Sequence, residues 1–417
     1  MSERVVVTGM GLVTPLGRGV EETWRRVVAG DNAIGAIRRF DPTGFDVRFA
    51  AEVPDPGWPA GLDPHRLYGG LGALSYDLKG RLTAVALVEA LHQAGWEVAP
   101  EGQDPRVGVC IGSEAARPPL SALHARLADP RPPTHEELLA LAPEAPTRLA
   151  AALAGAGGPR STISTACTSS SQAVGEGALR IRRGEVDAMI VGGVDVLVDP
   201  IMVTGFSLLG ALSTRNEDPA RASRPFDIDR DGFVLGDGAG FLVLEREDRA
   251  LARGARPLAV ISGYGCSCNA WRITDSPPDG RGAASSMAAA LRDAGLAPQA
   301  IGYINAHGTS TQQNDASESA GIHRVFHAVG THPAVSSTKS LMGHLVAACG
   351  AVEIALCALA VRDGVLPITR NLERPSPECE LDHILGQARR VPVQHTLSNA
   401  FGFGGSNGSV VVSAVDG

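Results

Sequence analysis

Ser161-Thr-Ile-Ser-Thr-Ala-Cys-Thr-Ser-Ser170 is the stretch of this 417-residue chain that says most about its fold. A short run rich in β-branched residues ends at Thr165, and small, helix-compatible residues follow from about Ser169 to Arg183. The pattern predicts a strand, a sharp turn and a helix, with Cys167 at the helix N-terminus. Because the unpaired N–H groups there favour an anion, we expect a lowered thiol pKa and a nucleophilic thiolate.

Two histidine motifs follow apolar stretches in the second part of the chain. His307 comes after Ile301-Gly-Tyr-Ile304, which predicts a buried strand, and His344 comes after Ala334-Val-Ser-Ser337. An apolar helix is expected from Leu345 to Val361. Since α/β folds place ligands at the C-terminal ends of strands, the cysteine and the two histidines indicate a nucleophile with basic partners.

Further motifs run in a fixed order along nearly the whole chain. The motifs are Arg4–Gly17, Ala211–Asn216, Arg224–Asp227, Arg230–Gly240 and Asn399–Asn407. With them the chain resembles the β-ketoacyl-acyl carrier protein synthases of the thiolase superfamily, and most closely the type II elongating enzymes.

Composition excludes several classes of protein. The net charge of −8 argues against a nucleic-acid partner, and docking of an acidic carrier protein would need a local basic patch. Seven scattered cysteines fit a reducing cytoplasm, and neither a signal peptide nor an apolar run of membrane-spanning length is evident. His323 and His327 have the spacing of zinc ligands but no evident third ligand, so no metal site is predicted.

The chain divides into two similar halves. An apolar strand that ends in glycine opens each half, Arg4–Gly9 in the first and Pro257–Gly265 in the second, and we expect domains at 1–255 and 256–417. The resemblance implies a duplicated thiolase-like α/β fold in five layers, α-β-α-β-α, with the site where the halves meet. Near-continuous apolar strands such as Ala188–Val194 indicate parallel sheets covered on both faces.

The resemblance implies a decarboxylative Claisen condensation in two half-reactions. Cys167 takes an acyl chain from a thioester, and a malonyl carrier thioester then loses CO2 and attacks that chain. The backbone N–H groups of Cys167 and Phe403 would form one oxyanion hole, and His307 and His344 would donate to the other.

The resemblance also assigns supporting roles. Lys339 and Glu353 match a pair beside the histidines, although an ordinary helix salt bridge is the alternative. Thr309 and Thr311 match hydroxyls that bind the phosphopantetheine arm of an acyl carrier protein. Because the substrates arrive on that arm, no bound cofactor is expected.

Two loops in this family shape access to the site. Phe401 and Phe403, flanked by glycines, match a gating loop, with a packed glycine turn as the alternative. Residues 114–160 match the segment that shapes the acyl pocket and the dimer edge. Here the chain has Glu114-Ala-Ala-Arg-Pro-Pro119 where the family commonly has a glycine-rich turn, so acyl chain length is not predicted.

Assembly and pathway follow from the same resemblance. The strand Ser161–Thr165 would pair with its copy across a two-fold axis, giving a homodimer, or a heterodimer with a cysteine-less homologue. Departures at Cys268–Asp275 and Leu209–Ala211 favour a dedicated carrier or a polyketide or polyene pathway, with fatty acid synthesis still open. A non-catalytic chain-length-factor-like subunit and a non-decarboxylating acyltransferase or thiolase are the alternative functions.

Overall fold

A computed structural model describes residues 4–67, 71–114, 128–132, 134–135, 138–139 and 142–415 of the chain. Most of the 114–160 segment is included, but residues 115–127 are not. The expected acyl-pocket lining in that part therefore lies outside the described residues.

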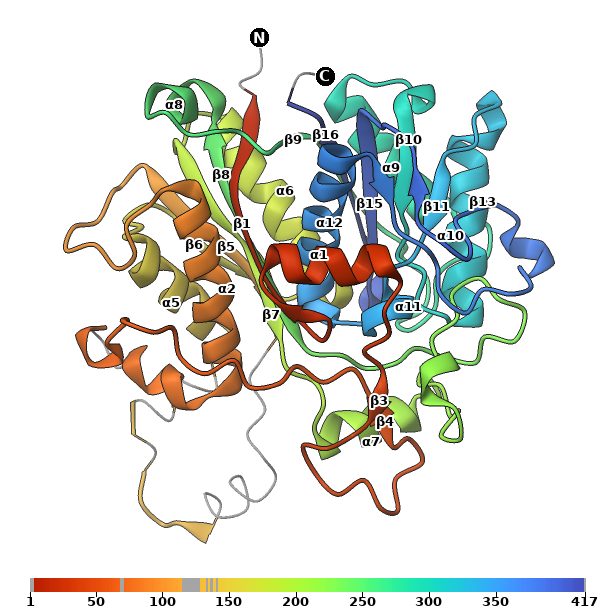
Figure 1. The fold of residues 1–417 in the computed structure, drawn as a ribbon, viewed down its shortest axis with the longest axis horizontal. Coiled ribbons are helices and arrows are strands. Elements are labelled where there is room, and N and C mark those ends of the chain that lie inside the picture. Colours follow the sequence, from red (N-terminus) through yellow and green to blue (C-terminus); the bar gives the residue numbers. More distant parts are fainter. Residues whose placement is uncertain are drawn as a thin grey trace.

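The first half of the chain builds five strands of one twelve-stranded mixed sheet, in the order β6-β5-β7-β8-β1 (Figure 1). β5 pairs in parallel with β6 and β7, whereas β8 is antiparallel to both β7 and β1. The strands are β1 (Val5–Thr14), β5 (Val107–Ser113), β6 (Arg160–Ile163), β7 (Ala188–Asp195) and β8 (Gly238–Arg246).

The second half repeats this arrangement in the order β11-β10-β15-β16-β9, and β9 pairs with β1 to join the two halves in one sheet. β10 is parallel to β11 and β15, and β16 is antiparallel to β15 and β9, so the strand directions match those of the first half. The strands are β9 (Ala259–Cys268), β10 (Ile301–Asn305), β11 (Ala334–Ser336), β15 (His395–Phe401) and β16 (Ser406–Ser413), with β13 (Asp382–His383) added beside β11.

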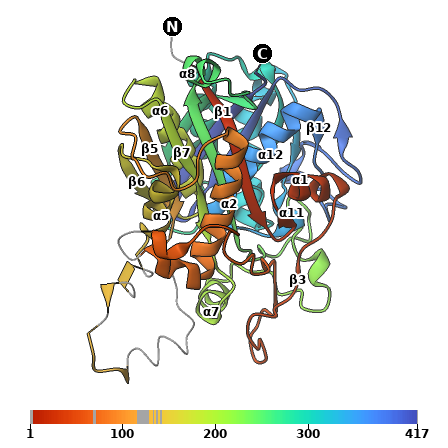
Figure 2. The same ribbon diagram turned by 60° about the vertical axis from the view of Figure 1, so that its left-hand side comes forward.

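Helices complete five layers, as expected (Figures 1 and 2). α6 and α12 lie centrally and contact strands of both halves. α2 and α5 cover the outer face of the first half-sheet, and α9, with α10 packed on it, covers the second. These helices are α2 (Leu78–Ala94), α5 (Ala145–Ala154), α6 (Ser169–Arg182), α9 (Arg281–Ala294), α10 (Gln312–Val325) and α12 (Cys349–Asp363).

The expectation of parallel sheets is wrong for part of the sheet. β8 and β16 run antiparallel to their neighbours, yet they are buried along nearly their whole length. Burial of both faces favours apolar residues in a strand whatever its direction. A long apolar run therefore indicates that both faces of the strand are covered, and does not indicate whether the strand pairs in parallel or antiparallel.

Glycines let each outer helix lie directly on its strand. A Cβ on Gly9 of β1 would lie 2.0 Å from the Ala90 carbonyl oxygen of α2, and a Cβ on Gly263 of β9 would lie 2.2 Å from the Ala290 oxygen of α9. The glycine-ending strands noticed in the sequence thus have the same packing role in both halves. The proposed division at 255/256 falls in the loop before β9, and its position stays a prediction.

The remaining elements surround this framework. Among the described residues, no helix has the length and apolar character needed to cross a membrane, and all seven cysteines are free thiols. The helices are α1 (Val20–Ala29), α7 (Pro200–Leu208), α8 (Glu247–Ala252) and α11 (Lys339–Met342). The short strands are β2 (Gly17–Arg18), β3 (Gly35–Ala36), β4 (Phe49–Ala50), β12 (Val365–Leu366) and β14 (Arg389–Arg390).

Candidate active site

Cys167 lies on a tight turn between β6 and α6, which confirms the strand, turn and helix expected from the sequence. A 3-10 turn spans Ala166–Thr168, and Ala166 has a left-handed backbone with φ of 51°. Such a conformation is uncommon for a residue other than glycine. The Ser169 hydroxyl supports the turn, since it donates to the Ala166 carbonyl at 2.7 Å and accepts from the Thr165 N–H at 2.9 Å.

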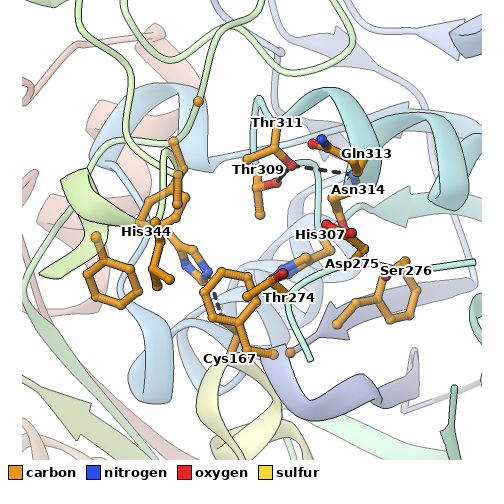
Figure 3. Close-up of a pocket in the computed structure, with 18 of the residues that line it drawn as sticks. Cys167, Thr274, Asp275, Ser276, His307, Thr309, Thr311, Gln313, Asn314 and His344 are labelled. Carbon is orange, nitrogen blue, oxygen red and sulfur yellow. Dashed lines mark hydrogen bonds between the residues drawn. The ribbon is translucent and has the colours of Figure 1, made fainter. Parts of the chain in front are cut away.

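His344 lies against the nucleophile (Figure 3). Its Nε2 is 3.0 Å from Cys167 Sγ, and its Nδ1 accepts the Val346 N–H at 3.3 Å. Because Nδ1 accepts, the proton of the neutral ring belongs on Nε2, which faces the sulfur. The helix after His344 begins at Cys349 rather than Leu345, because Val346 has a φ of 41° and opens a 3-10 turn first.

His307 completes a cluster of three. It follows β10, and its ring centroid lies 5.2 Å from that of His344. The cysteine sulfur and one nitrogen of each histidine all lie within 4.8 Å of one another, the only such cluster of potential metal ligands among the described residues. The three residues singled out in the sequence therefore meet, although they come from three separate segments.

These residues line a cavity of about 320 Å³. Thr309 and Thr311 also line it, and their hydroxyls are 2.9 Å apart (Figure 3). Thr274, Asp275 and Ser276 lie on another side of the same cavity. The cavity thus has a reactive end with a thiol and two imidazoles and a wall with hydroxyl groups that can hydrogen-bond amides.

The expected lowering of the Cys167 pKa is wrong for the resting protein. Burial raises the pKa of this thiol to about 12. The Lys339 charge and the backbone N–H groups of Phe403 and Cys167, which reach the sulfur, act in the opposite direction but do not outweigh burial. Desolvation disfavours the thiolate more than the helix terminus favours it, so the nucleophile is stored as a thiol.

Both histidines are held neutral. Burial lowers the pKa of His307 and of His344 well below the usual value, and the nearby Lys339 charge lowers each further. Neutral imidazoles can donate a hydrogen bond to a developing oxyanion without bringing a fixed charge to the site.

Lys339 and Glu353 form the expected pair, with Nζ 2.5 Å from Oε1. Both are buried, and they come from α11 and α12 rather than from one surface helix. Burial lowers the pKa of Lys339, but Glu353 and other neighbours outweigh it and the net pKa is raised. The ammonium therefore stays charged next to the two histidines.

Phe401 and Phe403 flank Gly402, whose backbone packs against the turn that carries Cys167. A Cβ on Gly402 would lie 2.9 Å from the Thr165 carbonyl oxygen, so only glycine fits there without displacement. The Phe401 ring lies 5.7 Å from that of His307, and the Phe403 ring lies 6.3 Å from that of Phe206. Both phenylalanines line the cavity.

Replacing Phe403 with Ala tests the expected gate. Because Phe403 lines the cavity and is only half-buried, Phe403→Ala should loosen the order in which the two substrates react more than it harms folding. Rapid-quench kinetics of acylation and condensation measure this, with Phe45→Ala as a control outside the cavity. Unchanged rates for both half-reactions would argue that the loop is only a packed glycine turn.

Two residues that support the site were not assigned that role from the sequence, Glu318 and Asn399, although Asn399 begins one of the motifs named above. The Glu318 carboxylate accepts the N–H groups of His307 at 2.9 Å and Gly308 at 2.8 Å, and Asn399 Nδ2 donates to it at 3.1 Å. Burial raises the pKa of Glu318 to about 7, against these hydrogen bonds. A glutamate on a polar helix gives no sequence signal of burial, because such residues normally face solvent.

A thiol on a helix-initiating turn, faced by two neutral imidazoles on a duplicated five-layer α/β framework, defines the condensing enzymes of the thiolase fold. Two family models match the chain, the N-terminal domain of β-ketoacyl synthases at residues 2–250 and their C-terminal domain at 258–373. The chain belongs to the β-ketoacyl synthase family.

Similar proteins agree with this assignment. A 3-oxoacyl-[acyl-carrier-protein] synthase 2 from Synechocystis sp. is 40% identical over 97% of this chain and 96% of its own. The ishigamide ketosynthase/chain length factor structure matches with a TM-score of 0.85 at 32% identity over 99% of this chain and 100% of that one. A type II polyketide acyl-carrier protein in complex with its ketosynthase bound to the hexaketide matches at 0.84 and 30%, over 100% of both chains.

Proposed function

We propose that this protein is an elongating β-ketoacyl-acyl carrier protein synthase, which joins a malonyl unit to an acyl chain held on Cys167 and releases CO2. The observation that carries the proposal is the meeting of Cys167 with His307 and His344 at one end of the cavity. The experiment is a condensation assay in which acyl and malonyl carrier thioesters are supplied together and the β-ketoacyl carrier product is measured by mass.

In the first half-reaction the Cys167 sulfur attacks the carbonyl carbon of an acyl thioester. A C–S bond forms to Cys167, the C–S bond to the donor arm breaks, and the proton from Cys167 passes to the released arm thiol. The N–H groups of Cys167 and Phe403 already reach the sulfur, so they are placed to stabilise the oxyanion that forms beside it. Proton loss coupled to acyl transfer explains how a thiol with a raised pKa can react.

In the second half-reaction the malonyl carboxylate leaves as CO2. The electron pair left behind forms an enolate, whose oxygen accepts hydrogen bonds from the Nε2–H of His344 and from His307. The α-carbon then attacks the acyl carbonyl on Cys167, the C–S bond breaks, and the released thiolate takes a proton from water. Burial keeps both imidazoles neutral for this donor role, and the charge of Lys339, paired with Glu353, acts in the same direction.

The carrier protein supplies both substrates. Thr309 and Thr311 present hydroxyls on the cavity wall, where they would bind the amides of the phosphopantetheine arm. The reaction requires no resident cofactor, because the thioester activates each carbonyl. The polyketide ketosynthase that shares this fold is captured with its acyl-carrier protein, which supports the same class of partner here.

Two alternative functions fit the site less well. A non-catalytic chain-length-factor-like subunit would not need Cys167, which is present and contacted by His344. A thiolase would use a second cysteine facing the substrate, but the nearby Cys349 directs its Sγ to the Cys167 carbonyl at 3.2 Å and does not line the cavity.

The pathway depends on which carrier is accepted. The relative from Synechocystis sp. is named a 3-oxoacyl-[acyl-carrier-protein] synthase 2, whereas two structural relatives are a type II polyketide ketosynthase and the ishigamide ketosynthase/chain length factor. Condensation rates with a fatty acid carrier and with the carrier of a neighbouring biosynthetic cluster would distinguish fatty acid synthesis from polyketide or polyene synthesis.

The location we propose is the cytoplasm. Seven free thiols support a reducing compartment of this kind.

Assembly as a dimer is a further prediction. β6 is the last strand of its sheet, and its open edge is next to the nucleophile turn, so pairing with a copy would protect it. We expect an interface above ~2,000 Å². Light scattering should give twice the 43.1 kDa chain mass. A stable, active monomer would contradict this, and an inactive homodimer rescued by a cysteine-less homologue would identify a heterodimer.

A further inference from the structure

Glu114 lies directly after β5. β5 lies next to β6 in the sheet, with Gly112 opposite Ile163, so the chain leaves both strands side by side. This placement brings a carboxylate to the turn that holds Cys167.

The Glu114 carboxylate contacts that turn. Oε2 accepts the Ser164 hydroxyl at 2.7 Å, and Oε1 accepts the Ala166 N–H at 3.1 Å. Both donors lie just before Cys167 in the chain. The Ser169 hydroxyl, which follows Cys167 and donates to the Ala166 carbonyl, lies 3.3 Å from the same Oε1. Hydrogen bonds to a carboxylate are stronger than those to a neutral acceptor, so Glu114 clamps the start of the turn.

The backbone of Glu114 is itself anchored by a buried ion pair. Lys79, in the first turn of α2, donates its Nζ to the Glu114 carbonyl and lies 3.8 Å from Asp195 at the end of β7. Lys79 is 5% exposed and Asp195 is fully buried. The turn is therefore connected through Glu114 to α2, β5 and β7.

We propose that Glu114 is a positioning residue for acyl transfer, because its carboxylate holds Ala166 in the left-handed conformation that presents the sulfur and N–H of Cys167 to the cavity. An alanine rarely adopts this conformation unless its surroundings impose it. Among the described contacts of Ala166, its backbone N–H makes one hydrogen bond to a charged group, and the acceptor is the Glu114 carboxylate.

The proposal affects one half-reaction selectively. Acyl transfer uses the sulfur and N–H of Cys167, which lie on the clamped turn. Decarboxylation of the malonyl thioester uses His307 and His344, which come from the loops after β10 and α11, and no described contact joins Glu114 to either. The inference rests on the proposed function for the identity of these two steps.

The test compares Glu114→Ala with Glu114→Gln, which keeps an acceptor for the Ala166 N–H. Acylation of Cys167 from a simple acyl thioester, such as a hexanoyl N-acetylcysteamine thioester, is followed by intact mass. We expect the maximal acylation rate to fall roughly tenfold in Glu114→Ala, with KM little changed, and to recover in Glu114→Gln. Glu101→Ala, an exposed glutamate ahead of the same strand, is the matched control.

Malonyl carrier decarboxylation is measured separately with Cys167→Ala added, so that it reports the histidines alone, and it should be unchanged by Glu114→Ala. Wild-type acylation rates in Glu114→Ala would overturn the proposal. So would a parallel loss of both activities that Glu114→Gln does not restore, because that result indicates only a structural role.

A second variant serves if Glu114→Ala does not fold. Ser164→Ala removes one contact to the same carboxylate and should slow acylation about threefold. No slowing would overturn the proposal. A wild-type protein that forms no β-ketoacyl product but acylates Cys167 would refute the proposed function alone.

Discussion

A Cys167→Ala variant is expected to acquire no acyl group at all. The thiol is the nucleophile at the reactive end of the cavity, and the two imidazoles beside it are neutral hydrogen-bond donors with no role as acyl acceptors in the proposed reaction. Removing the sulfur removes the covalent intermediate rather than slowing its formation. The loss should be complete within the detection limit.

Intact mass spectrometry after incubation with an acyl carrier thioester measures this result. Wild type and Cys268→Ala, which lacks an exposed thiol instead, should gain the acyl mass. An acyl adduct on Cys167→Ala would disprove the nucleophile assignment. Alkylation of wild-type Cys167 by iodoacetamide should also rise about tenfold per pH unit from pH 7 to 9, because the thiol pKa of about 12 lies above that range.

His307→Ala and His344→Ala are expected to accept the acyl group yet fail to condense it. Each removes one donor to the enolate oxygen, and loss of one oxyanion donor typically costs ~10²–10³ in rate. The backbone N–H groups that serve the acylation step are left in place. Chain extension should therefore fall by that factor while the acyl-enzyme still accumulates.

Rapid-quench analysis of acyl-enzyme and β-ketoacyl product separates the two steps, with the exposed His65→Ala as control. Product formation at the wild-type rate in either variant would contradict the donor role. The pH dependence gives a second check. Because burial lowers the pKa of both histidines well below the usual value, protonation of the imidazoles should not slow condensation between pH 8 and 6.5.

The local order of the site could be predicted from sequence, because each motif lies within a few consecutive residues. The turn at Cys167 and the strand before His307 follow from short patterns of β-branched, small and apolar residues. The pairing of Lys339 with Glu353 needed the family resemblance, since the two residues are on different helices.

What could not be predicted depends on contacts between distant segments. The raised pKa of Cys167 results from burial by the whole fold, whereas its sequence neighbourhood indicates only the helix terminus. Glu318 supports His307 from a helix whose sequence suggests a solvated face. The antiparallel direction of β8 is likewise set by how the chain returns to the sheet, which an apolar run does not encode.

The turn that contains Cys167 has a counterpart in the second half of the chain. Val346, with φ of 41°, begins a 3-10 turn that leads into α12, just as Ala166 begins the turn that leads into α6. The position equivalent to the nucleophile is occupied by Ala347, which is fully buried. One copy of the turn thus carries the reactive thiol, and the other has an alanine at that position and instead holds His344 through the Val346 N–H. The two steps of the reaction are in this way divided between two copies of the same turn.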